Sequence, residues 1–157
     1  MNILPAYIWP PLSWVQLATT FRTFQITYPP YLPKGSYYAR YWLPEGRWLS
    51  IPLLHSTKRT PWDAQWPPDK PWRAYHWRTL LTLYGKAPFF YEWKPFLEYL
   101  YVEGTFHRLQ EVCTCILKEL SPIFGWQFSW CVEPLPVPEV SSPRETSILS
   151  HLLRMGI

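Results

Sequence analysis

The fold is decided by residues 2–28, NILPAYIWPPLSWVQLATTFRTFQITY. Residues 2–9 are mostly apolar and lead into a Pro-Pro pair, as a short strand before a turn does. A proline suits the first turn of a helix, and apolar residues in 12–21 recur at helical spacing. Residues 23–28 alternate polar and apolar, the period of a half-buried strand. This β-α-β order predicts an α/β sheet with at least one parallel crossover.

The following segments predict a hairpin and three helices. Residues 37–54 contain two strand-like runs around Glu45-Gly46, a turn signal, and are typical of a β-hairpin. Later elements are a helix over 71–86, one from about Pro95, one capped by Thr105, and a strand over 126–132. The predicted fold is a single small α/β domain with a short mixed sheet packed by three helices. Residues 1–132 form this domain, and 133–157 form a Pro-rich linker or arm and a short tail.

Composition supports one folded domain and argues against a disordered chain, a basic tail and a membrane span. The chain has 157 residues, 19% of them aromatic, and 19 prolines that suit rigid turns better than disorder. Its net charge of +4 suits an anionic ligand, but no Lys/Arg run forms a basic tail. The first 21 residues are uncharged, yet prolines and polar residues interrupt them, so no membrane span is predicted.

The cysteines point to a reducing compartment. Their number, three, is odd, which argues against a disulfide framework and favours the cytoplasm. No Cys-x-x-Cys or His-x-x-x-His pair offers metal ligands, and with six glycines the chain lacks the usual phosphate and dinucleotide loops. The sequence therefore names no metal and no cofactor.

A dense group of cations and aromatics in residues 71–90 marks a candidate site. His76 could act as a general base, because its ordinary pKa lies near neutrality. The alternative is a core histidine that hydrogen-bonds to the backbone. Arg78 could bind a phosphate or carboxylate, or form a surface ion pair instead. Further anion candidates are Arg40 and, on the following loop, His55, Lys58 and Arg59.

Four segments in register resemble the WbqC-like protein family. Residues 3–11 are similar to its N-terminal strand and Pro-aromatic-Pro turn, and 34–40 to its Lys-Gln-Ser-Tyr-Arg-Asn-Arg segment. Residues 49–55 resemble its Leu-Ser-Ile-Pro-Val strand. The strongest match, 71–90, resembles its Trp-x-x-x-His-Trp-Arg/Lys helix and aromatic exit. The resemblance covers residues 3–125.

The resemblance implies a transferase that acts on an activated or amino sugar in surface-polysaccharide (O-antigen) biosynthesis. The alternative is a non-catalytic binding or accessory protein for a nucleotide, sugar or nucleic acid. Carried over by position, the catalytic residues are His76, Arg78 and Arg40, with the arginines holding a phosphate or carboxylate. The substrate-binding residues carried over are Lys34, Ser36, Tyr37, Trp77, Tyr84 and Lys86.

The chain departs from the family pattern in two ways, one in the site and one in its length. Tyr38-Ala39 stands where the family has Arg-Asn, which removes one cation and one amide from the site. Family members also carry a further α/β portion after the third helix, so we expect either a minimal member or a site completed by a second copy or a partner chain. The expected ligand is a small molecule such as a nucleotide sugar, and no membrane span is expected. Nucleic acid stays open, with salt-dependent binding as its test.

Overall fold

The chain opens with the predicted β-α-β unit. The computed structural model, which describes residues 1–33, 36–54, 61–141 and 144–157, places β1 at Ile3–Pro5, α1 at Leu12–Phe21 and β2 at Thr23–Thr27. β1 and β2 pair in parallel, as the sequence predicts. The indole of Trp14 donates a 2.8 Å hydrogen bond to the carbonyl of Pro5 and so fastens α1 to β1.

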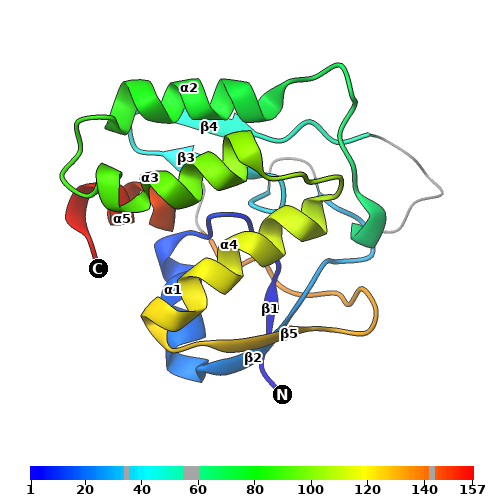
Figure 1. The fold of residues 1–157 in the computed structure, drawn as a ribbon. Coiled ribbons are helices and arrows are strands. Elements are labelled where there is room, and N and C mark those ends of the chain that lie inside the picture. Colours follow the sequence, from blue (N-terminus) through cyan, green and yellow to red (C-terminus); the bar gives the residue numbers. More distant parts are fainter. Residues whose placement is uncertain (34–35, 55–60, 142–143) are drawn as a thin grey trace.

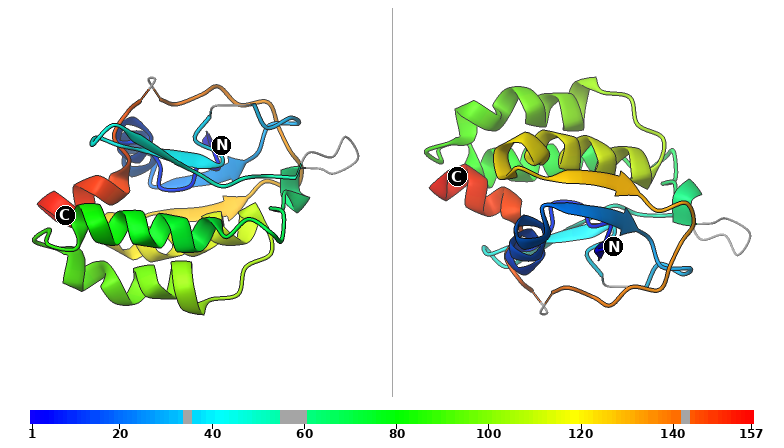
Figure 2. Two further views of the ribbon diagram at one scale, coloured as in Figure 1. Left: turned by 90° about the horizontal axis from the view of Figure 1, so that it is seen from above. Right: turned by 90° about the horizontal axis from the view of Figure 1, so that it is seen from below.

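A third parallel strand completes this sheet. β5 (Gln127–Trp130) pairs with β2, so the strand order is β1-β2-β5 and β2 is central. α4 (Leu109–Phe124) precedes β5 and runs alongside it in both views of Figure 2. Gly125 ends α4 with a φ of 73°, a left-handed conformation that suits glycine, and the chain then reverses into β5.

The hairpin forms a second, separate sheet rather than part of one mixed sheet. β3 (Arg40–Leu43) and β4 (Arg47–Ser50) pair antiparallel around Gly46, whose φ is 92°. The Pro-rich segment 29–33 carries the chain away from β2 before β3 begins. Figure 1 shows the hairpin with α2 (Trp72–Tyr84) at the top of the molecule and the three-stranded sheet at the bottom.

α2 begins within one residue of its predicted start, whereas the two helices after it begin at other residues than predicted. η1 (Pro61–Asp63) is a single 3₁₀ turn, and α3 (Phe90–Glu98) begins before Pro95 and contains it. A proline inside a helix leaves the carbonyl four residues earlier without its donor, and here that residue, Tyr91, is exposed. α3 continues into a π-helical turn, η2 (Tyr99–Glu103).

The C-terminal segment, predicted to be a linker and a tail, packs into the same core. The Leu135 amide donates to the Tyr28 carbonyl, and the Ile148 amide donates to the Pro10 carbonyl at 2.8 Å. α5 (Ile148–Met155) buries both Leu152 and Leu153 completely. The apolar residues of α5 recur at helical spacing, and burying that stripe stabilises the helix against the rest of the protein.

No helix among the described residues could cross a membrane. Within residues 1–33, 36–54, 61–141 and 144–157, none combines the length and apolar character that a bilayer span requires.

Candidate functional site

His76 lies in the core, where α2 packs on the hairpin. Its side chain is 0% exposed, its Nε2 is 2.9 Å from the Ser50 carbonyl oxygen, and its Nδ1 is 3.0 Å from Tyr41 Oη. A carbonyl can only accept, so Nε2 carries the ring proton and donates it to Ser50. Nδ1 therefore accepts from the Tyr41 hydroxyl.

The Tyr41 hydroxyl continues into a longer hydrogen-bonded chain. Tyr41 Oη is 2.7 Å from Tyr101 Oη, and the Trp9 indole donates to Tyr101 Oη at 3.0 Å. Because Tyr41 gives its proton to His76, it accepts the proton of Tyr101, which in turn accepts from Trp9. Each of these buried polar groups thus has a partner, and the direction of every bond is fixed.

Burial keeps the His76 ring neutral. Desolvation lowers its pKa to about 4, and the hydrogen bond to the Ser50 carbonyl opposes this shift only in part. Both ring nitrogens are occupied by the protein itself, as in the core-histidine alternative. The catalytic role of His76 stays a prediction, and this geometry gives it no nitrogen that faces solvent.

Arg40 lies on the other face of the hairpin. Arg40 and Tyr41 are successive residues of β3, and successive side chains of a strand point to opposite faces. Tyr41 contacts His76, whereas the Arg40 guanidinium lies 3.6 Å from the centre of the Trp48 ring. The structure does not bring Arg40 and His76 together in one site.

The face that carries Arg40 is a stack of cations and indoles. Trp42 and Trp48 are opposite each other in the hairpin register, with ring centres 5.1 Å apart, and both are half-buried. The guanidinium of Arg144, an exposed residue, lies 5.6 Å from the Trp42 ring. We call Arg40, Trp42, Trp48 and Arg144 the outer hairpin face.

Two predicted ligand-binding residues precede β3, and one of them, Tyr37, packs against this face. The Tyr37 ring packs edge-on against Trp48, and its hydroxyl donates to the Glu145 carbonyl. Burial raises the pKa of Tyr37, and the nearby Glu145 carboxylate adds to the shift. Ser36 is also buried, and its hydroxyl donates to the Pro33 carbonyl at 3.0 Å. Both side chains thus hold the segment that leads into β3.

Three more predicted residues lie along α2 and just beyond it, away from the outer hairpin face. Arg78 and Lys86 are exposed, and Trp77 is half-buried between the rings of Phe90 and Tyr101, with centres 6.1 and 6.4 Å away. The cations at 34, 55, 58 and 59 (Lys34, His55, Lys58 and Arg59) lie outside the described residues.

Tyr84 connects three elements in the core. Its side chain is fully buried, and its hydroxyl lies 2.7 Å from the Glu45 carboxylate and 3.0 Å from Ser150 Oγ. The single proton of Tyr84 goes to the carboxylate, so Ser150 donates to Tyr84. Glu45 also pairs with Arg154. Tyr84 thereby joins α2 to the hairpin turn and to α5.

Sequence reasoning selected Arg40 but missed the indoles beside it. A signal for them exists, because a turn at Glu45-Gly46 fixes the hairpin register and places Trp42 across from Trp48. Arg144 could not have been found in this way. Its place depends on how the C-terminal segment packs against β3, where Thr146 bridges Trp42.

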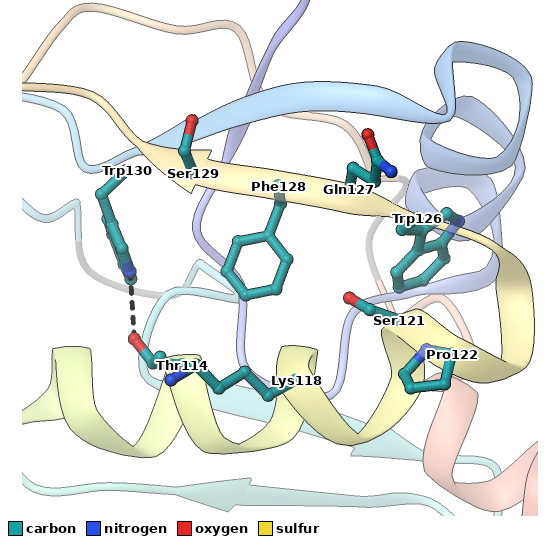
Figure 3. Close-up of a pocket in the computed structure, with 9 residues that line it drawn as sticks. All are labelled: Thr114, Lys118, Ser121, Pro122, Trp126, Gln127, Phe128, Ser129 and Trp130. Carbon is teal, nitrogen blue, oxygen red and sulfur yellow. Dashed lines mark hydrogen bonds between the residues drawn. The ribbon is translucent and has the colours of Figure 1, made fainter.

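A groove of ≈ 620 Å³ lies between α4 and β5, away from the hairpin (Figure 3). Phe128 and Trp130 point from β5 toward α4, and the Trp130 indole donates to Thr114 Oγ1 at 3.0 Å. Among the described residues that line it, Lys118 alone carries a charge. The lining residues are Thr114, Lys118, Ser121, Pro122, Trp126, Gln127, Phe128, Ser129 and Trp130.

Metal ligands do not gather in the part of the chain that the structure describes. There, no group of three or more His, Cys, Asp or Glu side chains could hold an ion.

Comparison with known proteins identifies the family. No curated protein and no solved structure matches the chain. The sequence profile of the WbqC-like protein family matches residues 12–151, which include the hairpin, α2 and the first half of α5. This match covers most of the chain and agrees with the segments in register at 34–40, 49–55 and 71–90. The chain belongs to the WbqC-like protein family.

Proposed function

We propose that this WbqC-like chain binds a phosphate-bearing sugar, such as a nucleotide-activated sugar, on the outer hairpin face. The observation that carries the proposal is the stack of Arg40, Trp48, Trp42 and Arg144. It combines two guanidinium groups with two half-buried indoles within one face of a short hairpin.

The chemistry of these groups suits such a ligand. A guanidinium can give two parallel hydrogen bonds to a phosphate, and such charge-assisted bonds are about twice as strong as neutral ones. Indole faces stack on bases and sugar rings, and a neighbouring cation strengthens the interaction. Tyr37, fixed by its bond to the Glu145 carbonyl, packs against Trp48, so the indole is positioned before a ligand arrives.

The proposed role is binding, without chemistry at His76. A general base must come within hydrogen-bond reach of the proton that it removes. His76 lies on the opposite face of the hairpin from Arg40, and both of its nitrogens bond to the protein. The transferase hypothesis, which rests on the family resemblance, would need another base at the outer hairpin face.

Calorimetric titration with UDP-, GDP- and dTDP-sugars tests the proposal. Arg40→Gln removes the charge of Arg40, and a hydrogen bond to a charged group is worth about 1.5–3 kcal/mol, so we expect Kd to rise about 10-fold or more. Arg144→Gln, at an exposed position, should weaken binding in the same direction without risk to the fold. Arg78→Gln, an exposed cation on α2, is the matched control and should bind like the unsubstituted protein.

Two results would count against the proposal. One is equal affinity of the Arg40→Gln, Arg144→Gln and Arg78→Gln variants for every nucleotide sugar that binds. The other is release of free nucleotide from a nucleotide sugar by the unsubstituted protein in the presence of amine or hydroxyl acceptors. That second result would replace the binding role by the transferase.

A further inference from the structure

β5 forms an outer edge of the three-stranded sheet. The amides of Gln127 and Cys131 donate to the carbonyls of Arg22 and Ile26, at 2.7 and 3.0 Å, on the β2 side. Alternate residues of a strand direct their backbone groups to opposite sides, so the N–H and C=O of residues 128 and 130 face outward. Among the described residues, neither outward pair has a backbone partner.

This edge carries neither a charge nor a proline, two of the features that normally protect an edge. Residues 126–132, Trp-Gln-Phe-Ser-Trp-Cys-Val, contain no charge and no proline, and Val132 is fully exposed. Charged residues, prolines and very short strands are the usual means of preventing a further strand from pairing with an edge. Both edge strands are short, but the opposite edge, β1, also ends in Pro5, which has no N–H to offer an added strand. Within the three-stranded sheet, as far as the structure describes it, the β5 edge is therefore the less protected of the two.

The groove follows this open edge. Five consecutive residues, 126–130, line it, so it runs along the strand and not over one face of it. α4 supplies the opposite wall, and the view in Figure 3 places Lys118 across from Phe128. A volume of ≈ 620 Å³ is within the range of clefts that hold ligands. A strand edge next to a helix is a recurring site for β-strand addition.

We propose that an extended segment of a partner protein, carrying a carboxylate side chain, adds to β5 as a fourth strand and lies in this groove. Outward backbone groups at residues 128 and 130 would pair with the main chain of the segment. Lys118, a charged residue of the groove's α4 wall, would pair with its carboxylate. A second copy of β5 does not fit as well, because the strand residues Gln127–Trp130 offer no acidic side chain to Lys118, and the first one, Glu133, lies beyond the end of the strand.

Amide hydrogen exchange measured by NMR tests this proposal with a defined probe. The probe is the capped heptapeptide Thr-Val-Thr-Glu-Thr-Val-Thr, compared with the same peptide carrying Lys in place of Glu. At millimolar concentration, the Glu peptide should slow exchange of the Phe128 and Trp130 amides about 10-fold or more. The Lys peptide should have a clearly smaller effect, and Lys118→Glu should reverse the preference.

A pair of strand variants separates backbone pairing from side-chain packing. Phe128→Ala keeps the outward N–H, whereas Phe128→Pro removes it, so protection of the Trp130 amide by the Glu peptide should survive in the first and disappear in the second. Equal protection in both variants, or no protection by either peptide, would overturn the proposal. Protection that rises with protein concentration alone, together with a doubled mass in light scattering, would instead assign the edge to a second copy.

Discussion

The hydrogen-bonded chain from Trp9 to His76 joins distant parts of the sequence through single side chains. Trp9 follows β1, Tyr101 lies in the π-helical turn η2, Tyr41 lies in β3 and His76 lies in α2. The chain ends on the Ser50 carbonyl of β4. Removing one member leaves its buried neighbours unsatisfied, which costs more than the net worth of the bond itself.

His76→Phe tests this role by keeping an aromatic ring at the position and removing both hydrogen bonds. The Tyr41 hydroxyl would lose its acceptor and the Ser50 carbonyl its donor. At about 1–3 kcal/mol for each of these two unsatisfied buried groups, we expect a loss of about 2–6 kcal/mol in the free energy of unfolding. Urea denaturation measures it, with Arg78→Ala, exposed on the same helix, expected to change stability by less than about 0.5 kcal/mol. A His76→Phe protein as stable as Arg78→Ala would contradict the structural role.

The low pKa of His76 also predicts how stability depends on pH. The folded ring has a pKa of about 4, below the ordinary value of 6.5 in the unfolded chain, so the unfolded state binds more protons between these values. The part of the free energy of unfolding that depends on a neutral His76 is therefore fully present above pH 6.5. It falls as the pH is lowered toward 4, by about 3 kcal/mol in total. Unfolding curves measured at several pH values should show this loss of free energy of unfolding. In the His76→Phe variant, the free energy of unfolding should fall less steeply between pH 6.5 and 4.

At the scale of elements, α5 is the helix that closes the core. Its apolar side contacts the body of the protein, and its last turn is fixed by the pair between Arg154 and Glu45. Glu45 also accepts the proton of Tyr84, so the hairpin turn, α2 and α5 meet at one carboxylate. The same C-terminal segment places Arg144 on the outer hairpin face. A loss of α5 packing would therefore disturb the candidate site as well.

Leu152→Ala tests the contribution of α5 to stability. Leu152 is 0% exposed, and replacing a fully buried leucine by alanine removes apolar burial and leaves a cavity. We expect a loss of about 2–5 kcal/mol in thermal or urea unfolding. Met155→Ala, on the same helix but 69% exposed, should cost less than about 0.5 kcal/mol. If the two variants lost the same small amount, α5 would be an appendage and not part of the core.

At the scale of the whole molecule, local patterns predicted the elements better than their assembly. The opening β-α-β unit and the hairpin follow from period, proline placement and turn chemistry, all of which act over a few residues. The arrangement in two sheets does not follow from local pattern, because β5 pairs with β2 across about a hundred intervening residues. The packing of 133–157 is long-range in the same sense, and proline content alone pointed to a linker.

The candidate site was predictable to the same extent. Motif and charge selected Arg40 and His76, but only the alternation of β3 separates them, with Tyr41 on the His76 side. The indoles of the outer hairpin face could have been found from the hairpin register. The orientation of Arg144 depends on contacts between segments about a hundred residues apart, which a local pattern does not contain.

On the proposal above, the outer hairpin face, and not His76, meets the ligand. NMR titration of the protein with a nucleotide sugar tests it most directly, because each indole N–H and each histidine ring nitrogen gives its own signal. We predict that the indole signals of Trp42 and Trp48 shift as the ligand is added, while the His76 ring nitrogens keep the signature of a neutral ring protonated at Nε2. If the signals of the His76 ring nitrogens shifted while those of Trp42 and Trp48 stayed unchanged, the outer hairpin face would not be the binding site.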